Sequence, residues 1–294
     1  MNGKTCIITG ATSGIGRATA NELGVRGAAL VLLGRNERAG AAVVAHIQRR
    51  TSAPRVEFIP TDLAHQASVR ESAQAILSQH AQIDVLINNA GARNDTFQRS
   101  ADGAELTFAA NHLGHFLLTA LLLERLLQAP AARIITVSSQ THASANLDHG
   151  WETGEPGYDR KQAYARSKLA NLMFAYALAH RLDDARAISI AVDPGVVASG
   201  FARNNGLVSW LKHLIAHGLR RELSSPAAAA KHIARLALDP EVAAGNGRYY
   251  RHGVAISSSA PSLDPALARD LWRLSVERTG LDETLGPIWK IFRP

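Results

Sequence analysis

Short apolar runs alternate along this chain with longer segments in which apolar residues recur at helical spacing. The apolar runs are residues 5–9, 29–33, 55–60, 84–88, 133–138 and 188–193, with a weaker seventh at 248–251. Because the runs are short and rich in apolar, β-branched residues, they predict strands buried on both faces, as in a parallel sheet. The helical segments are 14–26, 36–50, 66–80, 103–128, 162–182, 226–238 and 265–279. This alternation predicts an α/β fold with a doubly wound parallel sheet of about seven strands.

Two segments interrupt the alternation. Residues 140–163 form a polar insertion, and residues 199–225 lie where such a fold places a lid over its ligand. Within the second segment, residues 207–221 have an apolar face opposed by basic side chains, which predicts an amphipathic helix. This helix suits a lid over a bulky apolar substrate, peripheral contact with an anionic membrane, or ordinary core packing. The sequence leaves the three alternatives open.

The composition is typical of a globular protein, and we expect a single domain over residues 1–294. Hydrophobic residues make up 46% of the chain, and no apolar run approaches the length of a membrane span. The first strand begins too close to Met1 for a signal peptide. The one cysteine, Cys6, lies within that strand and has no partner for a disulfide. We therefore expect a cytoplasmic location.

The net charge of +7 raises the alternative of nucleic-acid binding. However, Lys and Arg are scattered along the chain, and neither zinc-finger spacing nor an RNA-binding aromatic motif is present. The 12 histidines form no metal-ligand pattern, so no metal is expected. The charge is better explained by a solvated surface and a positive potential near an anionic cofactor.

A glycine-rich motif, TGATSGIG, occupies residues 9–16 directly after the first predicted strand. Such a turn lets the backbone approach a pyrophosphate, to which the following helix presents free N–H groups. The motif alone is a weak signal, and its position after a strand is what favours a dinucleotide site. The residues expected to form this site are Gly10, Ser13, Gly14, Ile15 and Gly16.

The end of the second predicted strand indicates which dinucleotide is preferred. Sites that prefer NAD carry an acid there, which hydrogen-bonds the ribose 2′-hydroxyl. This chain has Arg35, whose guanidinium suits a 2′-phosphate. We therefore favour NADP(H), with NAD(H) as the alternative. After the third strand, Asp62 can accept from the adenine amino group, cap the helix that begins near His65, or do both.

Tyr164 and Lys168 are four residues apart and share one face of a predicted helix. A phenol has a pKa of about 10, and a nearby ammonium or oxidised nicotinamide favours the phenolate. This pair is therefore predicted to act in general acid–base catalysis. Ser139, at the end of the fifth strand, can hydrogen-bond a substrate oxygen. Asn111, near the start of a long helix, can hold a water that relays protons to Lys168.

Several neighbouring residues have simpler interpretations. Ser138 precedes Ser139 and is expected to point into the structure. His112 and His115 lie at the start of the central helix, where packing or hydrogen bonding is expected. His142 follows Ser139 closely and is the better candidate for contact with substrate.

These motifs, in this order, resemble those of the short-chain dehydrogenase/reductase family over nearly the whole chain. The matching residues are 9–16, NNAG at 88–91, Asn111, Ser139, YARSK at 164–168 and Pro194–Gly195. The resemblance implies a Rossmann-type sheet in the order 3-2-1-4-5-6-7 and hydride transfer between a nicotinamide and an alcohol or carbonyl compound. It implies a catalytic tetrad of Asn111, Ser139, Tyr164 and Lys168. The cofactor contacts expected in all are Gly10, Thr12, Ser13, Gly14, Ile15, Gly16, Arg35, Asn36, Asp62, Leu63, Asn89, Ala90, Gly91, Tyr164, Lys168, Pro194, Gly195, Val197 and Ser199.

Finer features are similar to the retinol-dehydrogenase-like branch of that family. They include residues 111–119, the long gap between Ser139 and Tyr164, and Ser225–Pro226. We expect an NADP(H)-dependent oxidoreductase that acts on a hydrophobic ketone, aldehyde or alcohol; a catalytically idle, cofactor-binding regulator is the alternative. By resemblance, the helices at 103–128 and 162–182 would form the surface of a homodimer or homotetramer.

Overall fold

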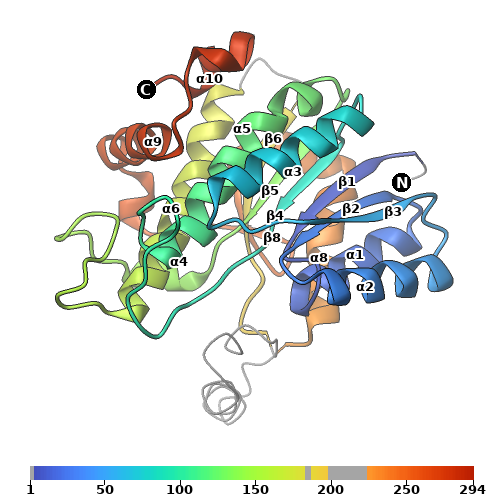
Figure 1. Ribbon diagram of the computed structural model, residues 1–294, viewed down its shortest axis with the longest axis horizontal. Coiled ribbons are helices and arrows are strands. Elements are labelled where there is room, and N and C mark those ends of the chain that lie inside the picture. Colours follow the sequence, from blue (N-terminus) through green and yellow to red (C-terminus); the bar gives the residue numbers. More distant parts are fainter. Residues whose placement is uncertain (1–2, 183–186, 198–223) are drawn as a thin grey trace.

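One eight-stranded sheet organises the protein, in the order β3-β2-β1-β4-β5-β6-β7-β8 (Figure 1). The computed structural model describes residues 3–182, 187–197 and 224–294. The strands are β1 (Thr5–Thr9), β2 (Ala29–Gly34), β3 (Val56–Pro60), β4 (Val85–Asn88), β5 (Ala132–Val137), β6 (Ala187–Asp193), β7 (Tyr249–Arg251) and β8 (Val254–Ile256). Strands β1 to β7 pair in parallel, which confirms the predicted doubly wound sheet and its strand order.

The eighth strand is an addition to the seven that the sequence predicts. It runs antiparallel to β7, and the pairing of Arg251 with Val254 leaves a two-residue turn of His252 and Gly253. Both turn residues have positive φ, +51° and +78°, as tight hairpins with the twist of a sheet require. All three residues of β8 are exposed, so no buried pattern marks this strand in the sequence.

Helices cover both faces of the sheet (Figure 1). They are α1 (Gly14–Val25), α2 (Glu37–Arg50), α3 (Gln66–Gln79), α4 (Leu106–Phe108), α5 (Gly114–Leu127), α6 (Arg160–Arg181), α8 (Pro226–Leu238), α9 (Pro265–Thr279) and α10 (Trp289–Phe292). One core layer joins the sheet to α3, α5 and α6, and the other joins it to α1, α2 and α8. Within β1, Ile7 enters the first layer, whereas Cys6 and Ile8 enter the second.

The segment predicted as one helix at 103–128 contains a wide turn. The carboxylate of Glu105 accepts hydrogen bonds from the N–H groups of Thr107 and Phe108, and α4 begins there. The chain then forms a π-helical turn, η1 (Ala109–Leu113), before α5 starts. Helical periodicity cannot reveal a single wide turn of this kind, which is frequent at functional sites.

The C-terminal segment closes the core over α5 and α6. Trp272 of α9 stacks on Phe292 of α10, and both rings contact Phe116 of α5. The indole N–H of Trp272 also donates to the Phe292 carbonyl oxygen at 3.0 Å. The helices implied as an oligomer surface are therefore covered, around this aromatic cluster, by the chain's own C-terminal helices.

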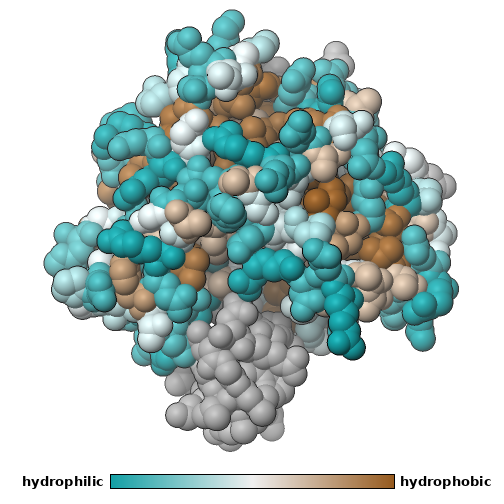
Figure 2. All heavy atoms as spheres, in the orientation of Figure 1, coloured by the Kyte–Doolittle hydropathy of each residue, from teal (hydrophilic) through white to brown (hydrophobic). Residues whose placement is uncertain are grey.

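The molecular surface is mixed in polarity, and the most apolar helical stretch is buried. Hydrophilic residues cover much of the face shown in Figure 2, and hydrophobic residues appear in separate patches between them. Among the described residues, one helical stretch, Leu106–Leu127, has the length and apolar character of a membrane span. Most of it is buried inside the protein, as in the core helix of a globular fold.

Replacing Phe292 with alanine tests how much the C-terminal cluster stabilises the fold. Phe292 is fully buried against Phe116 and Trp272, so the variant should lose about 3–5 kcal/mol of unfolding free energy. Urea denaturation followed by circular dichroism measures the loss. Lys290→Ala, an exposed change on the same helix, should stay within about 0.5 kcal/mol of the parent. Equal losses of unfolding free energy in the two variants would contradict the stabilising role of the C-terminal aromatic cluster.

Candidate active site

A cleft of about 1510 Å³ opens at the carboxyl ends of the strands. The loops after β1 to β6 contribute to its walls, as expected for ligand binding by an open parallel sheet. The predicted site residues that line it are Gly10, Thr12, Ser13, Gly14, Ile15, Gly16, Arg35, Asp62, Leu63, Asn89, Ala90, Gly91, Ser139, Tyr164, Lys168, Pro194, Gly195 and Val197. The structure thus brings nearly all of them to one place.

The glycine-rich turn is packed too closely for side chains. Gly10 has φ +66°, and a Cβ there would lie 2.9 Å from the Cα of Ala90. A Cβ on Gly16 would collide with the carbonyl oxygen of Gly10. The helix that follows, α1, begins at Gly14. The side chain of its N-cap, Ser13, forms no capping bond, and the first turn has no acidic residue. Its free N–H groups and exposed backbone fit the pyrophosphate of a dinucleotide.

Thr9 joins the glycine-rich turn to the loop after β4. Its hydroxyl oxygen accepts hydrogen bonds from the N–H groups of Asn89 and Ala90, both at 2.9 Å. The same oxygen lies 2.9 Å from Nε2 of His115. Because two donors already occupy the oxygen, the hydroxyl proton goes to His115, and Nδ1–H of that ring donates to the Asn111 carbonyl oxygen at 2.8 Å. His115 is thus a buried structural histidine, as predicted.

His112 and Ser138 also have the structural roles that the sequence predicts. His112 is buried, and its Nε2 lies 2.8 Å from the Ser275 hydroxyl. Burial lowers the pKa of His112 to about 3, so the ring is neutral at physiological pH. The Ser138 hydroxyl donates to the Lys168 carbonyl oxygen and braces α6 against β5.

The two predicted contacts with the adenosine half of the cofactor lie at neighbouring strand ends. Arg35 is exposed at the end of β2 and lines the cleft. Asp62 follows β3, and its Oδ1 accepts from the N–H of Ala64 at 3.0 Å. The N-cap of α3 is His65, without a side-chain bond, so Asp62 holds the turn before the helix and does not cap it. Asn36 lies outside the cleft lining and caps α2 by accepting from Ala39.

Tyr164, Lys168 and Ser139 meet at the other end of the cleft. Tyr164 and Lys168 share one face of α6, and the ammonium lies 5.6 Å from the centroid of the tyrosine ring. Lys168 donates to the Val137 carbonyl oxygen at 3.1 Å. The hydroxyl of Ser139 forms a hydrogen bond with Tyr164. These contacts fix a phenol, a hydroxyl and an ammonium side by side.

Burial opposes ionisation of both members of the Tyr164–Lys168 pair. It raises the pKa of Tyr164 above its usual value, and the charge of Asp193 raises it further. Burial lowers the pKa of Lys168 to about 8, partly offset by Asp193. The raised pKa is opposite to the lowering expected for Tyr164, and an effect of Lys168 on it stays a prediction. The cation that does lower it is Arg93, on the loop after β4, which the sequence did not single out.

Asn111 stands behind the cleft wall instead of lining it. Its side-chain oxygen accepts from the Ala92 N–H at 2.7 Å, and its amide donates to the Ala92 carbonyl oxygen and to the Ser167 hydroxyl. The side chain therefore holds the loop after β4 against α6. The π-helical turn η1 provides the geometry for this contact. A proton relay from Asn111 to Lys168 stays a prediction.

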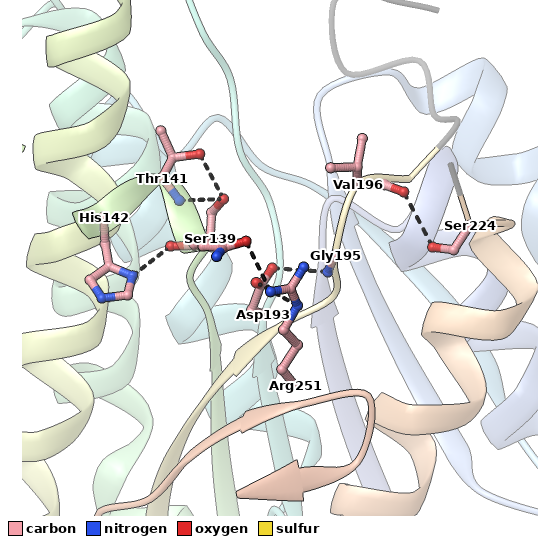
Figure 3. A network of polar contacts seen from close by, with 9 residues as sticks. Ser139, Thr141, His142, Asp193, Gly195, Val196, Ser224 and Arg251 are labelled. Carbon is pink, nitrogen blue, oxygen red and sulfur yellow. Dashed lines mark hydrogen bonds and ion pairs between the residues drawn. The ribbon is translucent and has the colours of Figure 1, made fainter. Parts of the chain in front are cut away.

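His142 does not face the substrate, contrary to the sequence-based expectation. It is buried, and its Nε2 accepts from the backbone N–H of Ser259 at 3.2 Å. Nδ1 must then carry the proton, which it donates to the Ser139 carbonyl oxygen at 2.7 Å (Figure 3). Burial lowers the pKa of His142, in agreement with a neutral ring. Its role is to hold the backbone of Ser139.

The chain is described up to Val197, just before the predicted lid, and again from Ser224, near the end of that lid. Val197 forms a β-bridge with Ser224, and the Ser224 N–H donates to the Val196 carbonyl oxygen at 2.8 Å. The two ends of the segment thus meet at the edge of the cleft (Figure 3). Residues 198–223, including Ser199 and the amphipathic stretch, lie outside the described residues.

The described wall of the cleft combines polar and apolar residues. Its polar members include Asn94, Thr96, Gln98, Gln140, Thr141, Ser144 and Lys161, and its apolar members include Leu106, Ala110, Val196 and Val197. The apolar face expected at 207–221 lies outside the described residues. Among the described residues, no group of three or more His, Cys, Asp or Glu side chains could hold a metal ion.

Comparison with known proteins decides the family. A model of the short chain dehydrogenase family matches residues 4–207. The chain belongs to this family. Retinol dehydrogenase 11 of Homo sapiens is 35% identical over 281 residues, covering 96% of this chain and 87% of the relative. Retinol dehydrogenase 14 of Homo sapiens is 36% identical over 295 residues, covering 96% and 88%. This short-chain dehydrogenase is therefore an oxidoreductase of the retinol-dehydrogenase-like branch.

Two solved structures share the fold. An uncharacterized protein from Mycobacterium paratuberculosis matches with a TM-score of 0.73 and 31% identity, over 96% of this chain and 95% of that one. L-Sorbose reductase from Gluconobacter frateurii, solved with NADPH and L-sorbose, matches with a TM-score of 0.69 and 20% identity, over 88% and 97%. At 20% identity the second likeness concerns the fold alone.

Gly16→Ala tests the cofactor cradle of this short-chain dehydrogenase. The added methyl group meets the Gly10 backbone, so the turn must move away from the position that admits a pyrophosphate. We expect NADPH affinity, measured by nicotinamide fluorescence, to fall on the order of tenfold or more, equivalent to about 1.4 kcal/mol. Gly154→Ala is the matched control, because its Cβ would have only ordinary contacts. Unchanged affinity in Gly16→Ala would contradict the assignment.

Proposed function

We propose that this short-chain dehydrogenase uses NADP(H) to interconvert a hydrophobic ketone or aldehyde and its alcohol, with Tyr164 as the general acid and base. The observation that carries the proposal is the convergence of Tyr164, Ser139 and Lys168 in one cleft with the glycine-rich turn. Bound in that cradle, the nicotinamide would supply or accept the hydride. We further propose that the enzyme acts in the cytoplasm.

The chain's own residues supply the proton and hold the substrate oxygen. In the reducing direction, Tyr164 donates its proton to the carbonyl oxygen, while the Ser139 hydroxyl hydrogen-bonds the same oxygen. The raised pKa of Tyr164 keeps the phenol protonated before reaction, as a general acid requires. Lys168, within reach of the nicotinamide ribose by family resemblance, provides a positive charge that stabilises the phenolate formed by this transfer. These features favour reduction as the direction.

The preference for NADP(H) rests on the end of β2. Gly34, Arg35 and Asn36 provide no acidic side chain for a ribose 2′-hydroxyl. Arg35 lies on the cleft wall and is exposed, so its guanidinium can form a forked contact with a 2′-phosphate. Asp62, one strand away, also lines the cleft and would accept from the adenine amino group.

The proposed substrate class is supported by the curated relatives. Their names identify them as retinol dehydrogenases, and retinol has a long apolar body with one hydroxyl group. Leu106, Ala110 and Val196 provide apolar contacts on the described wall of the cleft. The polar groups beside them would bind near the reacting oxygen.

Tyr164→Phe tests the catalytic role. Removing the hydroxyl takes away the proton donor, so kcat should fall by roughly 10²–10⁴-fold while NADPH binding persists. Single-turnover oxidation of NADPH with a panel of lipophilic aldehydes and ketones measures the effect. Tyr176→Phe is the control on the same helix: its hydroxyl contacts Ser258 and it does not line the cleft, so turnover should be retained. A Tyr164→Phe enzyme with normal turnover would refute the mechanism.

Arg35→Asp tests the cofactor preference. The substitution replaces the proposed 2′-phosphate contact with a repulsive charge, so NADPH should bind at least about tenfold more weakly while NADH is affected much less. Arg38→Asp gives the same change in net charge at an exposed position outside the cleft lining. Fluorescence titration with both nucleotides checks the result. An equal loss for NADPH and NADH in Arg35→Asp would argue against the preference.

A further inference from the structure

A buried carboxylate lies in the catalytic cleft and takes no part in the proposed reaction. Asp193 is the last residue of β6 and directly precedes Pro194, with 2% of its surface exposed. Its Oδ1 accepts the N–H of Gly195 at 2.9 Å. A buried charge is costly unless it is paired or hydrogen-bonded, so the presence of this carboxylate requires an explanation.

The partner of this carboxylate is Arg251, the last residue of β7. Nε of Arg251 lies 3.5 Å from Oδ2 of Asp193 (Figure 3). Nη1 of Arg251 donates to Oε1 of Gln140 at 2.9 Å. The parallel register of β6 and β7 places the two residues side by side. The Arg251 side chain is 32% exposed, whereas that of Asp193 is 3% exposed. The cation therefore faces water more than the anion does, and it compensates the anion incompletely.

Strand pairing places this carboxylate close to the catalytic groups: Lys168 donates to the Val137 carbonyl oxygen, and Val137 pairs with Val192, the residue before Asp193. Asp193, Arg251, Tyr164 and Lys168 line the same cleft. The carboxylate raises the pKa of both Tyr164 and Lys168, which favours the protonated form of each. For Lys168 this opposes the effect of burial, which favours the neutral amine.

Other charged and titratable groups face this cluster and are already accounted for. From α5, His115 is neutral because burial lowers its pKa to about 4. From η2 (Gln140–Ser144), His142 is neutral, and from β7 burial raises the pKa of Tyr249 so that it is a phenol. From the loop after β4, Arg93 is a permanent cation that acts on Tyr164. The carboxylates of Asp62 and Asp95 also line the cleft, but Asp193 is the one whose charge acts on Lys168.

We propose that Asp193 and Arg251 form a charge pair that sets the protonation of the catalytic residues. The negative charge of Asp193 favours the protonated forms of Lys168 and Tyr164, and the positive charge of Arg251 reduces that effect. This role rests on the proposed function of Tyr164 and Lys168. Neither Asp193 nor Arg251 touches the reacting atoms, so both are positioning residues. The pair adapts the site to reduction, in which Tyr164 must start as a phenol and Lys168 as an ammonium.

The pH dependence of NADPH binding tests the pair without requiring a substrate. If the Lys168 ammonium binds the ribose, the affinity falls as pH rises through the pKa of Lys168 in the free enzyme. Fluorescence titrations between about pH 6.5 and 9.5 give the NADPH dissociation constant at each pH. A plot of its logarithm against pH should change slope near pH 8 in the wild-type protein, and this change of slope is called the break. Lys168→Arg should lose this break, because a guanidinium does not titrate in that range. The 2′-phosphate of NADPH titrates near pH 6 and lies below the window.

Two variants should move the break in opposite directions. Asp193→Asn keeps an oxygen for the Gly195 N–H but removes the anion, so the ammonium is less favoured and the break moves to lower pH by roughly half a unit or more. Arg251→Gln leaves the anion uncompensated, so the break moves to higher pH. Arg251→Lys keeps the charge and should leave the break near its wild-type position.

The outcomes separate this inference from the proposed function. A break that stays in place in Asp193→Asn, or that moves downward in Arg251→Gln, would overturn the charge pair while NADPH binding itself remained normal. Absence of NADPH and NADH binding by the wild-type protein would overturn the proposed function and this inference together. Thermal melts of each variant show whether it is folded before its titration is interpreted.

Discussion

The hydroxyl of Thr9 joins the parts of the site that must keep a fixed relation. It accepts two backbone N–H groups from the loop after β4 and donates to His115, which in turn donates to the carbonyl oxygen of Asn111. This chain of bonds connects the glycine-rich turn on β1 to the π-helical turn before α5. Because every member is buried or nearly so, loss of one bond would leave a polar group unpaired at substantial cost. The cofactor cradle and the catalytic end are therefore held as one unit.

The chemistry at the catalytic end depends on a balance between burial and nearby charge. Burial alone would favour a neutral lysine and a neutral phenol. One carboxylate, at the end of β6, shifts that balance toward an ammonium beside a phenol, which is the combination that can deliver a proton and then stabilise the resulting anion. Parallel strands make this arrangement available, since consecutive strand ends bring side chains from distant parts of the sequence to one edge.

The local apolar runs predict the parallel sheet, the family resemblance implies its strand order, and nearly all the site residues predicted from motifs at strand ends line the cleft. What the sequence does not predict depends on tertiary contacts. The π-helical turn at 109–113 has the same apolar spacing as an ordinary helix, and β8 has no buried face to mark it. The direction of the Tyr164 pKa depends on burial, and the pairing of Asp193 with Arg251 depends on strand register. The His-Gly turn at 252–253 was the one local signal that could have revealed β8.

The aromatic cluster formed by α9 and α10 has a consequence for how the chain acquires its structure during synthesis. Phe116 and Phe174 lie in the middle of the sequence, yet both pack on Trp272, and Phe116 also packs on Phe292. Until the segments that carry Trp272 and then Phe292 have left the ribosome, these rings lack part of their apolar cover. A partial chain of this kind is prone to aggregation. We expect the nascent chain to depend on chaperones for longer than a fold whose core is completed by its first half.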